Sequence, residues 1–266
     1  MLTLLQTIIL GLIQGFTEFI PVSSSGHLVL AQVLMSGASD HLLIEFLDLG
    51  TTLALIIYFR KKIYEILHNI FVGRNFRLAR NLLLTAIPAG IIGYLLSDLL
   101  NSSWFFGSVV VVAIGLILIG IVMIVLEMLP KASHVKNGEE LSSKRALIVG
   151  IVQVFALIPG VSRSGSTIIA GRLAGLSAKE AAEYSFLASL PIMLGVSLKL
   201  FAGHTERAYL IEHFSTVLVS NIFAFIAGMI AVTFMLSYLK RHSLAIFGWY
   251  RVALGVVVLA TVLLIQ

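Results

Sequence analysis

Residues 14–27, QGFTEFIPVSSSGH, place a carboxylate, a hydroxyl and an imidazole within a short polar break in an otherwise apolar stretch. Glu18 follows Gln14 by four residues, so on a helix both side chains project from one face and could hold a divalent cation through oxygen atoms. His27 could act as a nucleophile or a general acid, and Ser24 as a nucleophile if a base lies beside it. Binding alone would not require this set of residues, so the motif favours catalysis.

A second polar break, PGVSRSGST at residues 159–167, contains an arginine inside an apolar stretch. Such an arginine is a functional hypothesis by default, and its planar guanidinium suits phosphate oxygens. Broken helices also present amide groups and helix N-termini that favour an anion. We therefore expect Arg163 to bind a phosphate group. The hydroxyls that could contact the same group are those of Ser23, Ser24, Ser162, Ser164 and Thr167.

Each candidate also has a structural interpretation that the sequence leaves open. Glu18 could pair with Arg163 only to hold two parts of the chain together. Gln14 has a counterpart in Gln153, because residues 11–26 are repeated at residues 150–165, as described below. A repeated glutamine fits a packing role as well as a metal-binding one. His27 taken alone would more often be a satisfied polar residue than a catalyst. The repeated serines could form turns and cap backbone groups, and the threonine of the second motif could cap the outgoing half-helix.

The composition is that of an integral membrane protein. Hydrophobic residues make up 59% of the chain and charged residues 12%, against about 45–50% and 25% in soluble domains. In such a protein the net charge of +5 reports topology, not a nucleic-acid partner. The absence of cysteine excludes disulfides, thiolate catalysis and cysteine-bound metals. The first residues, MLTLLQTIILGL, lack a basic region and a cleavage site, so we expect mature structure and not a removable signal.

The chain contains an internal repeat. Sliding the sequence by 139 residues places residues 11–26 over residues 150–165 without a gap, with identical residues at seven of the sixteen positions. Weak symmetry between halves is typical of transporter-like membrane folds. We therefore expect one membrane domain over residues 1–266, with repeat halves of about 1–130 and 145–266.

The elements that must position the two motifs are apolar stretches of about 20 residues, the length that spans a bilayer. Each motif is predicted to dip into the membrane as a re-entrant helix-loop-helix, and three candidate spanning helices follow it. An odd number of spans inverts the second half relative to the first. The expected fold is thus an all-α polytopic membrane protein of two inverted repeats. The expected spans are 42–59, 81–100, 104–129, 180–202, 214–239 and 244–265.

The basic residues predict the orientation. Of the 18 lysines and arginines, 14 fall in the connections 60–80, 130–145, 172–179 and 240–241. The positive-inside rule makes this face cytoplasmic and puts both termini and the mouth of the first motif outside. If the motifs crossed the membrane completely, the two ends of the second motif would lie on opposite faces, which weakens that alternative. The four basic residues left over are Arg163, Lys199, Arg207 and Arg251.

Other polar and aromatic residues carry weaker expectations. Glu45 and Asp48 fall in or beside a spanning helix and could approach the cavity between the motifs. The pair Glu180 and Glu183 is expected to mark a helix start near the cytoplasmic face. Tryptophans near helix ends are typical interfacial anchors, which is our expectation for Trp104 and Trp249. The histidines expected to be solvated are His41, His68, His134, His204, His213 and His242.

Together the two motifs resemble the paired signature of the undecaprenyl-pyrophosphate phosphatase family, (Glu/Gln)xxxGlu followed by PxSSxGH and later PGxSRSxxT. The resemblance covers essentially the whole chain. It implies a multi-pass plasma-membrane enzyme that removes the terminal phosphate of undecaprenyl diphosphate and so recycles the lipid carrier for cell-wall synthesis. It also implies dependence on a divalent cation, Mg²⁺ or Ca²⁺, an active site open to the outer face, and a possible homodimer.

Under this resemblance, Glu18 and Gln14 would hold the metal or orient water, Ser24 and His27 would be the catalytic candidates, and Arg163 would bind the diphosphate. One departure matters, because Gln14 occupies a place that is acidic in many members. The rival hypothesis is a polyprenyl-phosphate flippase or secondary transporter, since inverted repeats with broken helices are common among transporters. An acid beside a nucleophile favours the enzyme, because a phosphate carrier has little use for them.

Overall fold

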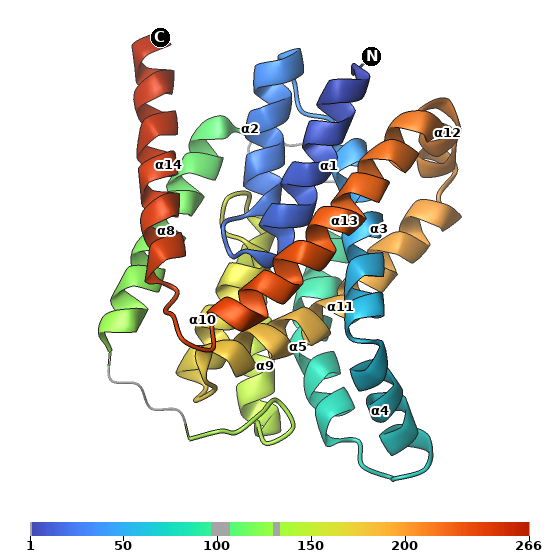
Figure 1. Ribbon diagram of the computed structural model, residues 1–266, viewed down its shortest axis with the longest axis vertical. Coiled ribbons are helices and arrows are strands. Elements are labelled where there is room, and N and C mark those ends of the chain that lie inside the picture. Colours follow the sequence, from blue (N-terminus) through green and yellow to red (C-terminus); the bar gives the residue numbers. More distant parts are fainter. Residues whose placement is uncertain (1, 97–106, 130–133, 266) are drawn as a thin grey trace.

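A computed structural model describes residues 2–96, 107–129 and 134–265 (Figure 1). Every regular element in these ranges is a helix, which confirms the predicted all-α fold. The α-helices are α1 (Leu4–Phe19), α2 (Ser24–Ser36), α3 (His41–Tyr58), α4 (Arg60–Phe71), α5 (Arg77–Leu95), α8 (Val109–Met128), α9 (Ser143–Val154), α10 (Arg163–Leu173), α11 (Ala178–Ala202), α12 (His204–Glu212), α13 (Phe214–Tyr238) and α14 (Ala245–Ile265). A short 3₁₀ helix, η1 (Phe155–Leu157), extends α9. Trp104 and Lys131 lie outside the described residues.

Six of these helices, α3, α5, α8, α11, α13 and α14, are long and apolar enough to cross a membrane. They overlap the six spans expected from the sequence, of which residues 97–100 and 104–106 lie outside the described residues, and the multi-pass character is confirmed. Large apolar side chains such as Leu118 and Ile230 remain exposed on their outer surfaces. Apolar residues facing outward all round a bundle are expected where the solvent is lipid and not water.

The helices of the two halves correspond to one another. A shift of 139 residues moves the first residue of α1 onto the first residue of α9, and Ser24 at the start of α2 onto Arg163 at the start of α10. The same shift brings the starts of α3, α5 and α8 within three residues of the starts of α11, α13 and α14. One helix contact is also repeated in the two halves. The shift relates α1 to α9 and α5 to α13, and α1 packs against α13 just as α9 packs against α5.

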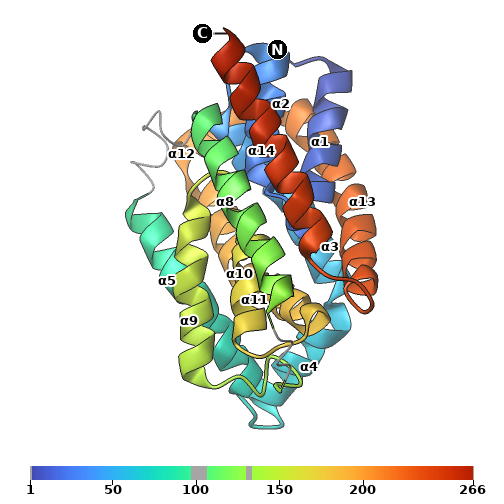
Figure 2. The same ribbon diagram turned by 90° about the vertical axis from the view of Figure 1, so that its left-hand side faces the viewer.

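The inverted relation of the halves stays a prediction, which the directions of the helices support. In Figure 2, α1 descends from the N-terminus, whereas α9 ascends from the connection at the other end of the molecule. The two motif segments therefore enter the bundle from opposite ends.

Both polar breaks end in the same backbone geometry. The residues before α2 and α10 are Ser23 and Ser162, with φ of 78° and 76°, a region that residues other than glycine rarely adopt. Each serine caps its helix by accepting a hydrogen bond from a glycine N–H, that of Gly26 or of Gly165. The repeated serines thus set the sharp turn between each pair of half-helices.

The second break lies close against α8, and small residues allow it. Gly160 has φ of +88°, and a Cβ atom at this position would collide with the backbone of Val112. A Cβ on Gly115 would lie 2.8 Å from the carbonyl oxygen of Pro159. Glycine at these positions lets the backbone of the break reach the centre of the bundle. The polar side chains of the motifs are thereby positioned within the membrane-spanning part of the molecule.

Candidate active site

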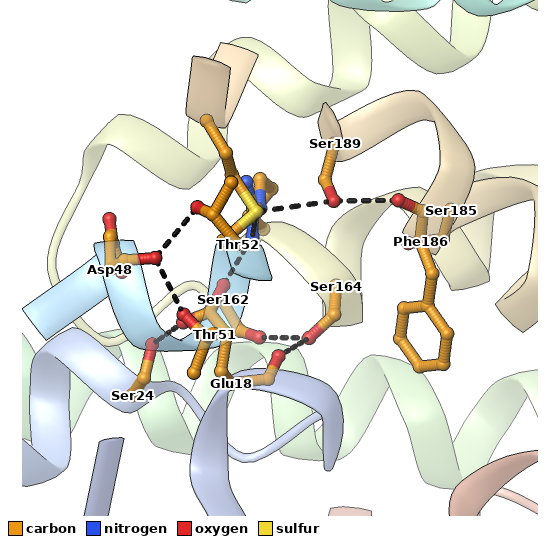
Figure 3. Close-up of polar contacts among 12 residues, drawn as sticks. Glu18, Ser24, Asp48, Thr51, Thr52, Ser162, Ser164, Ser185, Phe186 and Ser189 are labelled. Atoms are coloured by element: carbon orange, nitrogen blue, oxygen red, sulfur yellow. Dashed lines mark hydrogen bonds and ion pairs between the residues drawn. The ribbon is translucent and has the colours of Figure 1, made fainter. Parts of the chain in front are cut away.

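Glu18 lies at the centre of the polar cluster, one residue before the end of α1, with 8% of its side chain exposed. Its Oε1 forms an ion pair with Nη2 of Arg163, the first residue of α10. Its Oε2 accepts a hydrogen bond of 2.5 Å from Oγ of Ser24, the first residue of α2. The structure therefore brings together an acid and a hydroxyl of the first motif with the guanidinium of the second. Figure 3 shows Ser24 beside the Glu18 carboxylate.

The pairing of Ser24 with Glu18 has a direct chemical meaning. A serine hydroxyl is a weak nucleophile until an adjacent base can take its proton, and here the acceptor is a carboxylate. Both Ser24 and Arg163 also occupy the first turn of a helix, where backbone N–H groups attract anions. The cluster thus combines an activated hydroxyl with groups that attract a phosphate.

Arg163 retains donors for a ligand. Among the hydrogen bonds of the described residues only its Nη2 is used, toward Glu18 and toward Sδ of Met193 at 3.3 Å. About a fifth of its side chain is exposed. The Nε and Nη1 donors of the guanidinium can therefore contact phosphate oxygens while the ion pair keeps the side chain in place.

Asp48 is the carboxylate that extends this cluster toward α3. Nε2 of Gln14 lies 2.6 Å from Oδ1 of Asp48, 3.2 Å from Oε2 of Glu18 and 3.4 Å from Oγ1 of Thr51. The amide of Gln14 thus connects two carboxylates, and Figure 3 shows Asp48 and Glu18 on either side of Thr51. From the sequence, Asp48 was expected only as a residue that could approach the cavity.

The remaining hydroxyls of the predicted site have structural partners. Oγ of Ser164 donates to the backbone carbonyl of Glu18 at 3.1 Å and lies 3.3 Å from Oγ of Ser162. Thr167 is buried, donates to the carbonyl of Arg163 at 2.8 Å and lies 2.5 Å from Oγ of Ser185 on α11. These contacts match the capping and turn roles that the sequence left open. A role of Ser23, Ser162, Ser164 and Thr167 in diphosphate binding stays a prediction.

His27 contacts a different part of the molecule from Glu18. Its Nδ1 lies 2.8 Å from the carbonyl oxygen of Ser23, and its Nε2 lies 2.8 Å from the hydroxyl of Tyr250 on α14. The two rings are also stacked, with centroids 5.7 Å apart and planes 8° apart. The hydrogen bonds of the imidazole therefore run to the carbonyl of Ser23 and to α14, and not to Glu18 or Arg163. A catalytic role of His27 stays a prediction. Tyr250 was not expected from the sequence, and its partner is 223 residues away.

Arg251 is a second functional candidate that sequence reasoning missed. It is 0% exposed and donates only to backbone carbonyls. Its guanidinium reaches Pro21 in the first break at 3.0 Å, Gly160 and Val161 in the second break, and Gly115 and Leu116 on α8. An arginine within an apolar spanning helix is itself a signal. It was noted only as a basic residue away from the cytoplasmic face.

Other expectations can be placed on the structure. Glu45 pairs with Lys199 at 3.5 Å, and Glu180 lies in the first turn of α11, as expected of a helix start. Trp249 is 61% exposed on the surface of α14, which fits an interfacial position. The histidines expected to be solvated, namely His41, His68, His134, His204, His213 and His242, are exposed or half-buried.

The oxygen atoms of the cluster suit a hard divalent cation. Glu18 and Asp48 offer carboxylates, and Ser24 and Thr51 offer hydroxyls, all of them oxygen ligands that Mg²⁺ and Ca²⁺ accept. Gln14 turns its amide nitrogen toward this cluster, so a role of its amide oxygen as a metal ligand stays a prediction. In the described part of the chain, three or more histidine or acidic side chains do not gather into a metal-binding group. A cation here would therefore take further ligands from a substrate or water, as Mg²⁺ usually does.

Comparisons with known proteins cover nearly the whole length of this chain and point to one family. Residues 7–257 match the family described as bacitracin resistance protein BacA. Undecaprenyl-diphosphatase 2 of Pseudomonas fluorescens strain Pf0-1 is 38% identical, over 98% of this chain and 94% of that protein. Undecaprenyl-diphosphatase 1 of Clostridioides difficile strain 630 is 38% identical, over 98% and 96%, and undecaprenyl-diphosphatase of Pseudomonas aeruginosa strain UCBPP-PA14 is 35% identical, over 97% and 94%. With its two breaks meeting at an acid, a hydroxyl and an arginine, this chain belongs to the BacA family.

Proposed function

We propose that this chain is an integral membrane phosphatase that hydrolyses undecaprenyl diphosphate to undecaprenyl phosphate and inorganic phosphate. Its family and the names of its relatives support this activity. The observation that carries the proposal is the contact of Glu18 with both Arg163 and Ser24, which unites an anion-binding group, a base and a nucleophile from two distant motifs.

In the mechanism that this geometry supports, Arg163 holds the terminal phosphate and Ser24 attacks it. Glu18, 2.5 Å from the hydroxyl, takes the serine proton as the bond from Oγ to phosphorus forms. The bond from phosphorus to the bridging oxygen breaks, and undecaprenyl phosphate leaves with the electron pair. Glu18 then loses this proton to solvent and is a carboxylate again. It accepts a proton from the water that attacks the phosphoserine, and it passes that proton to Oγ of Ser24 as the bond from phosphorus to Oγ breaks. This step releases inorganic phosphate and restores the serine hydroxyl. Arg163 stabilises the negative charge on the phosphoryl oxygens in both steps.

A divalent cation, Mg²⁺ or Ca²⁺, is part of the proposal. When bound, it would neutralise negative charge on the phosphate oxygens. Glu18 and the amide oxygen of Gln14 are the ligands expected from the sequence, and the oxygen-rich surroundings of Glu18 fit such an ion.

The proposed location is the plasma membrane, with the active site open to its outer face. The basic residues of the connections 60–80 and 130–145 support this orientation. Release of the carrier lipid outside the cytoplasm fits its recycling in cell-wall synthesis. A homodimer stays a prediction from the family resemblance. The transporter alternative is not favoured, because the relatives are named as phosphatases and Ser24 lies beside a base.

The test is phosphate release from undecaprenyl diphosphate by the purified protein in detergent. We expect turnover by the wild type and a loss of about 100-fold or more in each of Glu18→Ala, Ser24→Ala and Arg163→Ala, the range for removal of a catalytic group. Glu183→Gln, which changes a carboxylate paired with Lys179 at the far end of α11, is the control and should retain activity. Folded wild-type protein that releases no phosphate from any isoprenyl diphosphate would contradict the proposal.

A further inference from the structure

Asp48 lies where the first motif lacks an acid. The family signature quoted above, (Glu/Gln)xxxGlu, allows an acid where this chain has Gln14, so the motif itself provides one carboxylate fewer. In the structure, the amide nitrogen of Gln14 is shared between Oε2 of Glu18, at 3.2 Å, and Oδ1 of Asp48, at 2.6 Å. A second carboxylate is therefore present in the cluster, but it comes from α3.

The position of Asp48 is fixed by the packing of α3. Its backbone carbonyl accepts hydrogen bonds from the hydroxyls of Thr51 and Thr52 at 3.0 and 2.7 Å. Two residues further on, Oδ1 of Asn221 on α13 accepts a hydrogen bond of 2.5 Å from the N–H of Gly50. The bond to Asn221 ties this turn of α3 to α13, and the carboxylate is held beside Gln14.

Asp48 has a neutral hydrogen-bond partner where a buried carboxylate usually has a cationic one. Its one side-chain hydrogen bond with a described residue is to the neutral amide of Gln14. Glu45, one turn earlier on the same helix, instead pairs with Lys199 at 3.5 Å. Ionised carboxylates within spanning helices are costly and usually find a cationic partner. Arg163 is engaged with Glu18, so Asp48 has no cationic side chain of its own within the described cluster.

A diphosphate adds negative charge beside these carboxylates. As cation ligands, Glu18 and Asp48 would both be ionised, which gives two negative charges against the single positive charge of Arg163. The donors of Arg251 are directed at backbone carbonyls and not at these carboxylates. A divalent cation between the carboxylates and the phosphate oxygens would remove the repulsion, in the arrangement of one or two carboxylates plus substrate phosphates that Mg²⁺ prefers.

We infer that Asp48 and Glu18 form the carboxylate pair that binds the divalent cation of this protein, with Asp48 of α3 taking the place of the acid that Gln14 does not provide. Gln14 holds the two carboxylates at a fixed separation through its amide. This inference rests on the proposed function, because the cation is placed where the substrate's diphosphate would bind.

The test removes the carboxylate at position 48 and then introduces one at position 14. Isothermal titration of Mg²⁺ and of Ca²⁺ into the purified full chain in detergent, without substrate, measures cation affinity independently of turnover. Asp48→Asn should weaken cation binding by about 10- to 100-fold, the range for loss of a group that supports a metal site, and hydrolysis should fall with it. The double variant Gln14→Glu with Asp48→Asn keeps the number of carboxylates and should regain most of both. Glu45→Gln, the matched control on α3, should behave like the wild type.

Unchanged cation affinity in Asp48→Asn would overturn the inference. If Asp48→Asn does not fold, Asp48→Ala and the double variant decide. Unchanged cation affinity in a monodisperse Asp48→Ala overturns the ligand role, and a monodisperse double variant that binds no cation overturns the exchange between positions 48 and 14. Failure of the proposed function gives a different pattern. A wild-type protein that binds the cation through Asp48 but releases no phosphate contradicts the phosphatase and supports the inference.

Discussion

At the scale of single residues, Tyr250 determines what the imidazole of His27 can do. The carbonyl oxygen of Ser23, 2.8 Å from Nδ1, can only accept a hydrogen bond, so Nδ1 carries the proton. In the neutral ring Nε2 is then an acceptor, and the hydroxyl of Tyr250 at 2.8 Å donates to it. The tyrosine therefore positions the histidine, both through this bond and through the parallel stacking of the rings.

The sequence makes His27 a catalytic candidate, and if it contributes to turnover, Tyr250→Phe is expected to lower kcat/KM only through this histidine. The change keeps the aromatic ring but removes the hydroxyl, and one hydrogen bond of this kind is worth about 0.5–1.5 kcal/mol, up to roughly a tenfold change in rate. The measurement is a double-mutant cycle with His27→Ala, together with the pH profile of hydrolysis. The effect of Tyr250→Phe should disappear when the histidine is absent, and the pH profile should shift only when it is present.

Trp249→Phe is the control for this cycle, because the neighbouring ring is exposed on the surface of α14. It should leave both kcat/KM and the pH profile unchanged. An equal loss from Tyr250→Phe with and without His27 would show that the hydroxyl acts by some route other than the imidazole.

The sequence predicted the chemistry of the site better than its contacts. Glu18, Ser24 and Arg163 could be identified because polar groups in an apolar stretch are costly and repeated motifs mark the breaks. Asp48 was noticed, but its partner Gln14 lies on another helix 34 residues away. Tyr250 could not be identified, since a tyrosine in a spanning helix is ordinarily an interfacial residue and no local pattern predicts a partner on α2.

At the scale of elements, α14 joins the two breaks through Arg251. The carbonyl groups of a broken helix need hydrogen-bond donors in an apolar interior, and this guanidinium contacts Pro21 in one break and both Gly160 and Val161 in the other. One side chain thus fixes the distance between the segments that carry Ser24 and Arg163. The planar fork with five donors suits this task, whereas an ammonium group does not.

Arg251→Lys is therefore expected to destabilise the protein and to disorder the site. Lysine keeps the charge but cannot reach carbonyls on both breaks, and hydrogen bonds to charged groups contribute about 1.5–3 kcal/mol each. The apparent melting temperature in detergent should fall. The rate of hydrolysis should fall by more than the fraction of protein that is unfolded at the assay temperature. Arg207→Lys on α12, where the side chain contacts Gly203 and His204 at the surface, should change neither. An unaltered melting temperature in Arg251→Lys would rule out this role.

The sequence identified the spanning helices and both breaks, but not the short surface helices. The segment 60–80 was expected as a polar connection, yet its first part forms α4, which has apolar and charged residues on different faces. α12 is similarly short and contains few apolar residues. Such helices depend on packing against the bundle and not on a long apolar run, so a search for membrane spans does not detect them.

At the scale of the whole molecule, three of the four basic residues away from the predicted cytoplasmic face have partners within the bundle. Arg163 pairs with Glu18, Lys199 with Glu45, and Arg251 with carbonyls of the breaks. These residues have structural or chemical roles, so they do not count against the topology. The excess of lysine and arginine in the connections on the predicted cytoplasmic face still predicts the orientation. Figure 1 also shows both termini at the opposite end of the molecule from α4, in the arrangement that this bias requires.

Cysteine labelling in intact cells tests both the orientation and the re-entrant motifs. The chain has no cysteine, so a single engineered one is the only reactive thiol. A membrane-impermeant maleimide should label Ala38→Cys, which is exposed after α2, but should reach Lys136→Cys and Leu173→Cys only after the membrane is permeabilised. Residues 136 and 173 precede and follow the second motif, and a re-entrant segment returns to the side from which it entered.

The pattern of labelling separates the alternatives. Reaction of positions 136 and 173 from outside, with position 38 protected, would reverse the proposed orientation. Reaction of only one of the pair 136 and 173 in intact cells would mean that the second motif crosses the membrane completely. In that case three further spans would not invert the second half, and the two breaks would enter from the same side. The contact of Glu18 with Arg163 then could not be explained by two motifs that meet from opposite faces.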